Sequence, residues 1–255
     1  MTSENANDPV PLLFKSFHLT SAARLYGELL PKAGSDGWTH QRFLRELLTG
    51  EHQDRQERLT LRLLKESQLP PGKTMATLDE SCLPAKIRRQ LPALLDGSFA
   101  GRAINILAFG LPGRGKTHFL AALAHELILR HHRRVLFIPT FKLVGHLLRA
   151  KSENRLPEAL KKLDRFDVMV LDDIGYVQQN REEMEVLFTF LAERYERKSL
   201  MISSNLVFSQ WDKIFKDPMT TMAAIDRLVH HSIILEFDGA ESIRTRKTKN
   251  TPPEK

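Results

Sequence analysis

Cysteine is nearly absent from this chain, which has Cys82 alone among its 255 residues. One cysteine cannot form a disulfide within the chain, so nothing in the sequence requires an oxidising compartment. The first ten residues lack the basic and apolar regions of a secretory signal, and no apolar run reaches the ~18 residues that span a bilayer. These absences argue against secreted and integral membrane proteins, and we expect a cytoplasmic protein with no membrane partner.

Residue patterns for zinc binding and for base reading are also missing. The histidine pairs His131–His132 and His230–His231 are adjacent residues, and adjacent side chains point to different sides of a helix, which makes poor metal sites. No cysteine and histidine spacing typical of zinc sites occurs, and no segment has the pattern of a DNA recognition helix. Sequence-specific reading of bases is therefore not expected.

Positive charge, in contrast, is in excess. The chain has 38 Lys and Arg against 31 Asp and Glu, a formal charge of +7, while hydrophobic residues make up 42%. The hydrophobic fraction is enough for a sizeable buried core. The positive excess favours a polyanionic partner, of which nucleic acid is the first candidate.

The first 70 residues contain helical patterns and no strand-like run. A helix that starts near Thr20 is expected to end at Pro31, and a second pattern starts at Thr39. Pro-Pro-Gly at 70–72 then marks a hinge. We predict four segments, in chain order: a helical N-terminal domain for interaction or oligomerisation (1–70), a linker and approach to the first strand (71–101), the main domain (102–243) and a basic flexible tail (244–255).

Five short apolar runs alternate with helix-length segments in the main domain. Strands separated by helices are typical of a parallel sheet that is covered by helices on both faces. We therefore predict an α/β domain with a five-stranded parallel sheet. The predicted strands are Ile104–Phe109, Val135–Ile138, Val168–Leu171, Leu200–Ser203 and Ile233–Phe237.

A glycine-rich turn follows the first predicted strand. Residues 110–117 read GLPGRGKT, and a helical pattern comes next, which is the strand, loop and helix context of a P-loop. Its backbone N–H groups can surround phosphates, and the N-terminus of the next helix favours an anion. We expect Lys116 to contact the β- and γ-phosphates of ATP and the Thr117 hydroxyl to bind Mg²⁺. The predicted cofactor-binding residues here are Gly110, Pro112, Gly113, Arg114, Gly115, Lys116, Thr117 and His118.

Acidic and amide side chains follow the third and fourth predicted strands. Asp172 is predicted to hold Mg²⁺ with Thr117, because ligands bind at the carboxyl ends of such strands. Asp173 is the candidate for polarising the attacking water, and Asn205 for bonding the γ-phosphate or that water. With Lys116 they form the predicted catalytic set. A solvated turn is the alternative interpretation of the acidic pair, and Asn205 also suits an ordinary turn.

Arg227, just before the last predicted strand, has two interpretations. It could be an arginine finger offered to the nucleotide of a neighbouring subunit, which would make it catalytic. It could equally be a helix residue that pairs with Asp226. The sequence leaves both open.

Basic residues are concentrated between Glu126 and Arg165. Apolar positions of this segment can pack inward while the basic side chains reach outward, and such a face neutralises the phosphates of duplex DNA with little sequence preference. A merely solvated basic helix is the alternative. The predicted DNA-binding residues are Lys142, Arg149, Lys151, Arg155, Lys161 and Lys162.

Taken together, these motifs resemble the IstB family of transposition helper ATPases, in the AAA+ group near DnaA and the DnaC helicase loaders. The sequence departs from the family pattern at Asp173, where the family usually has Glu, and at Ile243, where it often has Tyr. The resembling stretches are FLRELLTGE at 43–51, GLPGRGKTH at 110–118, VMVLDDIGY at 168–176, ERYERKS at 193–199, SSNLVFSQW at 203–211, DRLVHH at 226–231 and GAESIR at 239–244.

The resemblance implies an AAA+ fold, ATP-dependent self-assembly on DNA and assistance to a transposase. We expect an ATPase domain over 102–243 whose hydrolysis of ATP is slow and is stimulated by DNA or a partner. Few residues follow Phe237, so we expect a minimal C-terminal lid, Arg244 in place of a lid arginine, and an adjacent subunit that closes the nucleotide site. A helicase loader with the same ATPase is the nearest alternative. A small-molecule P-loop kinase and an architectural DNA protein with a vestigial P-loop are further ones.

Overall fold

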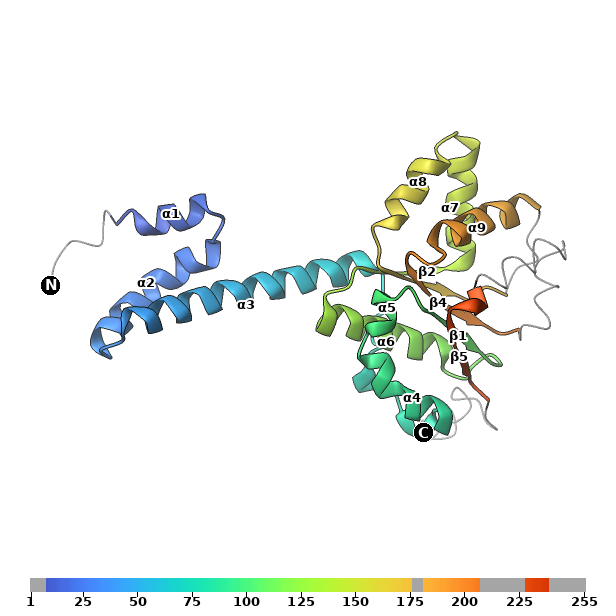
Figure 1. Ribbon diagram of the computed structural model, residues 1–255, viewed down its shortest axis with the longest axis horizontal. Helices are drawn as coiled ribbons and strands as arrows, with labels where there is room; N and C mark the ends of the chain where they lie inside the picture. Colours follow the sequence, from blue (N-terminus) through green and yellow to red (C-terminus); the bar gives the residue numbers. More distant parts are fainter. Residues whose placement is uncertain (1–7, 176–180, 207–227, 239–255) are drawn as a thin grey trace, which may run out of the picture. The chain divides into compact units, whose positions relative to one another are not determined.

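A computed structural model of the chain describes residues 8–175, 181–206 and 228–238 (Figure 1). These residues form two compact units that divide between Arg62 and Leu63. Within the described residues, no helix combines the length and the apolar character needed to cross a membrane.

The N-terminal unit is helical. It contains α1 (Val10–Ser16), α2 (Thr20–Ser35) and the first part of α3 (His40–Ser67). Ala22 and Leu47 are buried between α2 and α3, and the buried carboxylate of Glu51 accepts hydrogen bonds from the backbone N–H groups of Ser21 and Ala22 at 2.8 and 2.9 Å. Glu51 of α3 thus satisfies N–H groups that the first turn of α2 leaves without helical partners.

The expected end of the second helix at Pro31 was wrong, because α2 continues through Pro31 to Ser35. A proline removes a single N–H donor from the helical ladder. The bonds resume in the next turn, where the N–H of Asp36 donates to the carbonyl of Lys32 at 3.0 Å. One missing hydrogen bond is therefore tolerated inside the helix.

Residues 71–101 contain more structure than the linker expected there. They form two short 3₁₀ turns, η2 (Met75–Thr77) and η3 (Glu80–Cys82), and the helices α4 (Ala85–Leu95) and α5 (Ser98–Gly101). The buried side chains on α4, namely Ile87, Leu91 and Leu94, recur at helical spacing. This apolar face makes α4 part of the second unit, where it packs against α6 (Lys116–His131).

The predicted five-stranded parallel sheet is confirmed. Its strand order is β2-β3-β4-β1-β5, and all neighbouring pairs are parallel. Each strand lies within a residue or two of its predicted range. The bounds are β1 (Asn105–Phe109), β2 (Val135–Pro139), β3 (Val168–Asp172), β4 (Ser199–Ser204) and β5 (Ser232–Glu236).

Helices cover both faces of the sheet, as Figure 1 shows. One face packs against α7 (Thr140–Ser152), α8 (Leu156–Asp164) and α9 (Arg181–Arg194), whose apolar side chains share a buried cluster with Leu107 and Met169 of the strands. The other face packs against α6, where Phe119 and Leu123 are fully buried. Both faces of β1, β3 and β4 are therefore shielded from water, which explains their unbroken apolar runs.

Two buried polar side chains hold the amino-terminal ends of the strands. Asn105 donates from Nδ2 to the carbonyl of Leu228 at 3.3 Å and accepts from the N–H of Leu200 at 2.9 Å. Arg194 is only 2% exposed and donates to four carbonyls, which belong to Leu163, Phe166, Asp167 and Ser199. Burial lowers the pKa of the Arg194 guanidinium to about 10. These bonds join β1, β4 and the turns before β3 and β5.

Candidate functional site

The loop between β1 and α6 has the backbone that a phosphate site needs. Gly110, Gly113 and Gly115 have φ values of 146°, 80° and 89°, which residues with a side chain rarely adopt. A Cβ atom on Gly110 would lie 2.8 Å from the carbonyl oxygen of Phe237. The loop leads directly into α6, whose first residue is Lys116, so the N-terminus of that helix faces the loop.

Lys116 connects this loop to the end of β4. It is 6% exposed, and its Nζ donates to the carbonyls of Gly110 at 2.5 Å and Leu111 at 3.0 Å. The same Nζ donates to Oδ1 of Asn205 at 2.7 Å. The ammonium group thus lies within the glycine turn, where phosphates are expected.

Asp172, the last residue of β3, is held by two hydroxyl groups. Its Oδ1 accepts a hydrogen bond from Oγ1 of Thr117 at 2.9 Å and another from Oγ of Ser203 at 2.6 Å. The hydroxyl and the carboxylate are the oxygen ligands that Mg²⁺ prefers. Thr117 and Asp172 therefore fit the donor set of the magnesium site predicted for this pair.

Asp173 has an unusual backbone, with φ at 61°, which is uncommon for a residue with a side chain. Its N–H donates to Oγ of Ser203 at 2.8 Å, and its Oδ1 accepts from Nδ2 of Asn205 at 2.9 Å. Burial raises the pKa of the Asp173 carboxyl, the neighbouring Asp172 adds to the rise, and Lys116 opposes it. This carboxylate is thus partly withdrawn from water and is oriented by an amide.

The structure brings five of the predicted site residues together, which are Lys116, Thr117, Asp172, Asp173 and Asn205. The three predicted glycines form the loop beside them. His118 lies against η2, where its Nε2 is 3.1 Å from Oγ1 of Thr77. Nη1 of Arg114 is buried without a hydrogen-bond partner among the described residues. Arg227 and Arg244 lie outside the described residues, and the roles of all the predicted site residues stay predictions.

Ser203 is a contact residue that sequence reasoning missed. It is 2% exposed, and its single hydroxyl donates to Asp172 while accepting from the backbone of Asp173. The available signal was a polar side chain directly after the apolar residues 200–202 of β4, next to the strand that bears the acids. Ser203 therefore fixes both acidic residues at once.

The predicted DNA-binding residues lie on α7, on α8 and between these two helices. Lys142, Arg149, Lys161 and Lys162 are exposed. The other two are in salt bridges: Lys151 with Glu185 of α9 at 2.8 Å, and Arg155 with Glu153. A cleft of about 370 Å³ between α7 and α8 is lined by Arg149, Arg155 and Lys162, among others. We call the six residues the basic face.

The fold and this site together define a P-loop ATP-binding protein of the AAA+ class. The family model described as "IstB-like ATP binding protein" matches residues 13–251. The chain belongs to this IstB-like family, as its motifs had indicated.

Named relatives agree with the family. An insertion sequence ATP-binding protein of Sinorhizobium fredii is 39% identical over 236 residues, which is 92% of this chain and 78% of that protein. The IS21 ATP-binding protein of Pseudomonas aeruginosa is 36% identical over 245 residues, 93% of this chain and 89% of that one.

Solved structures agree with the fold. The DnaC helicase loader matches with a TM-score of 0.54 at 17% identity, over 69% of this chain and 99% of that one. The replication initiator DnaA, bound to AMPPCP and single-stranded DNA, matches with a TM-score of 0.55 at 17% identity, over 74% of this chain and 59% of that one.

We predict that Ser203→Ala weakens binding of ATP about 10-fold in the presence of Mg²⁺ and changes it little without Mg²⁺, because the lost hydroxyl orients Asp172. Calorimetric titration with ATP, with and without Mg²⁺, measures both affinities. Ser204→Ala is the matched control, since Ser204 is equally buried and, among the residues that the structure describes, its hydroxyl bonds to the backbone of Leu206 and not to the acids. Equal effects of the two substitutions would contradict a role for Ser203 at the metal.

Proposed function

We propose that this protein binds and hydrolyses Mg·ATP, assembles on duplex DNA in its ATP-bound form, and assists a transposase during transposition of an insertion sequence. The observation that carries the proposal is the contact network at the ends of β1, β3 and β4. In it, Lys116, Thr117, the two acids and Asn205 converge on the glycine turn.

When the nucleotide binds, some hydrogen bonds of this network are replaced by contacts with its phosphates. Lys116 leaves the carbonyls of Gly110 and Leu111 for the β- and γ-phosphate oxygens, which are stronger acceptors because they are charged. Thr117 and Asp172 would hold Mg²⁺, which would neutralise charge on the phosphates. Asn205 either keeps its hydrogen bond with Lys116 or donates from its amide to the γ-phosphate.

Hydrolysis needs a group that orients the attacking water. Asp173 is the candidate base, and its carboxylate is already held by Nδ2 of Asn205 at 2.9 Å. Because the pKa of Asp173 is raised, the ionised carboxylate accepts a proton more readily than an ordinary aspartate does. Its side chain is one methylene shorter than the Glu usual in the family, which is consistent with slow turnover.

Assembly on DNA is supported by the charge of the basic face. Five of its six residues are exposed on one helical layer, and contacts of such side chains with phosphates give affinity that does not depend on sequence. DnaA, a protein of the same fold, was solved with both AMPPCP and single-stranded DNA. For this chain we propose duplex DNA, with Arg227 offered to the nucleotide of a neighbouring subunit and Arg244 near its own.

The transposase is proposed as partner because relatives at 34–39% identity are named as insertion sequence ATP-binding proteins. A helicase loader is the second candidate, favoured by the match that covers 99% of the DnaC chain. Affinity capture with purified partners separates them. Retention of a transposase supports the first function, and retention of a replicative helicase supports the second.

We predict that ATP increases the size of the complex on duplex DNA and that Lys116→Ala abolishes this increase, because the variant lacks the ammonium group that contacts the phosphates. Sedimentation of the protein with a duplex, with and without ATP, measures the size. Circular dichroism checks that the variant is folded. A complex of the same size with and without ATP, in wild type and variant alike, would mean that the nucleotide does not drive assembly.

We predict that replacing Lys142, Arg149, Lys161 and Lys162 together by Ala weakens DNA binding and reduces the steepness of log K against log salt by about 3.6, since each of the four lost phosphate contacts removes about 0.9. Arg88→Ala with Arg89→Ala is the control, because both residues are exposed on α4 and outside the basic face. Fluorescence anisotropy over a salt series gives the slopes. An unchanged slope in the fourfold variant would place the DNA on another surface.

A further inference from the structure

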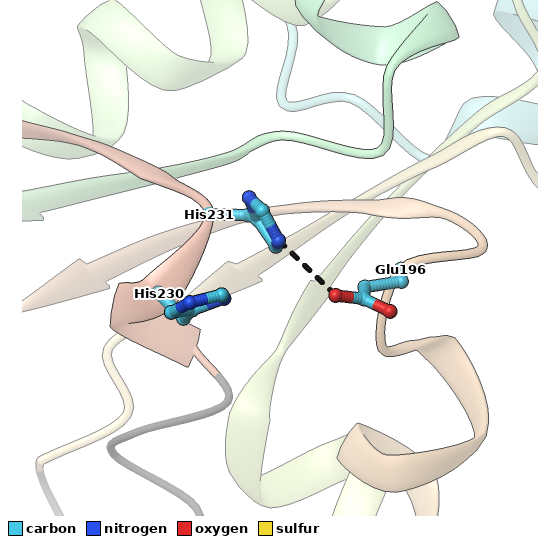
Figure 2. A group of neighbouring side chains, drawn as sticks. All are labelled: Glu196, His230 and His231. Carbon is cyan, nitrogen blue, oxygen red and sulfur yellow. Dashed lines mark hydrogen bonds and ion pairs between the residues drawn. The ribbon is translucent and has the colours of Figure 1, made fainter.

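Three metal-ligating side chains meet away from the nucleotide site. Glu196 lies in the turn after α9, and His230 and His231 come just before β5 (Figure 2). Nε2 of His231 is 3.1 Å from Oε1 of Glu196, and one ligand atom from each of the three residues lies within 4.8 Å of the others. We propose that Glu196, His230 and His231 form a binding site for a divalent transition-metal ion, with Zn²⁺ as the best fit.

The side chains of both histidines point toward Glu196 (Figure 2). This differs from the sequence-based expectation that the side chains of adjacent histidines point to different sides of a helix. His230 is the last residue of a helical turn, and His231 is in the turn that leads into β5. The rule for a regular helix does not apply across this change of backbone. Their ring centroids are 4.4 Å apart, and Figure 2 shows both rings near the Glu196 carboxylate.

The backbone that carries the two histidines is fixed by buried contacts, and the turn that carries Glu196 is held at the surface. The carbonyl of His231 accepts from the N–H of Asn105 at 2.8 Å, and Leu228, two residues before His230, is 2% exposed. On the other side, the turn at Glu196 has φ at 55°, and the next residue, Arg197, forms a salt bridge with Asp164 at 2.8 Å. Two turns thus present the three ligands, and the buried contacts beside His231 reduce the ordering cost of binding.

The donor set determines the class of ion. Two neutral imidazoles and one carboxylate suit Zn²⁺, which accepts such ligands with a water in the fourth position, whereas Mg²⁺ prefers oxygen alone. Tetrahedral ligands about 2.0 Å from zinc are roughly 3.3 Å from one another. The separation of 3.1 Å between His231 and Glu196 is already close to that value, and rotation of the exposed side chains can close the rest.

This site is distinct from the predicted magnesium site. It lies at the amino-terminal end of β5, while the glycine turn contacts Phe237 just beyond the opposite end. The five residues of β5 separate the two ends by about 16 Å. A bound ion would link the turn between α9 and β4 to residues 228–231. It would thereby stabilise the segment that leads into β5.

The test is a titration of the full chain with Zn²⁺ in competition with a chromogenic chelator, without nucleotide. We expect one ion per chain, an affinity at least 10-fold weaker in His230→Ala, His231→Ala and Glu196→Gln, and a Zn²⁺-dependent rise in Tm that each substitution removes. His52→Ala is the matched control, because His52 is exposed on α3 and is not part of the cluster.

Co²⁺ provides a second measurement. Its visible absorption should indicate a four- or five-coordinate site in the wild type, and this signal should disappear in His231→Ala while the variant keeps wild-type circular dichroism. Zn²⁺ binding that is equal in wild type and all three variants, or no binding by the wild type, would overturn the proposal.

Discussion

The nucleotide site depends on the polar end of one central strand. In β4, the apolar residues 200–202 are followed by Ser203 and Ser204, and Asn205 comes directly after the strand. The hydroxyl of Ser203 contacts both acids of β3, and the amide of Asn205 contacts Asp173 and Lys116. Without these two side chains, Asp173 would lose the hydrogen bonds to its N–H and its carboxylate, and Asp172 and Lys116 would each lose one of the contacts that orient them.

Strand order explains why β4 has this role. In the order β2-β3-β4-β1-β5, β4 lies between the strand that ends in the acids and the strand that ends in the glycine turn. All strands are parallel, so their carboxyl ends meet at one edge. Residues that are far apart in the chain, such as Lys116 and Asn205, thereby come within 2.7 Å. At the opposite edge of the sheet, the buried residue Asn105 bonds to the carbonyls of Leu228 and His231, next to the proposed zinc ligands.

The sequence predicts much of this arrangement, because strong local patterns determine it. The five apolar runs predict the strands, and the GLPGRGKT turn followed by a helical pattern predicts the phosphate loop. Features that depend on tertiary contacts were not predictable in the same way. Helix α2 continues through Pro31, α4 occupies the expected linker, and the strained backbone of Asp173 has no signature in the sequence.

Ser203 and His230 illustrate the same limit in the site itself. A serine near the end of a strand has many uses, and only the neighbouring strand reveals that Ser203 meets the acids. Adjacent histidines diverge in a helix, and only the helix end at His230 brings the two rings to one side. Side-chain pairs across strands and turns therefore need the fold before they can be recognised.

Binding of ATP by the wild-type protein tests the central claim most directly. The network of Lys116, Thr117, Asp172 and Asn205 predicts saturable binding of one ATP per chain in a calorimetric titration, with higher affinity when Mg²⁺ is present. A well-folded preparation that shows no heat of association with ATP, with or without Mg²⁺, would contradict the assignment of these residues to a nucleotide site.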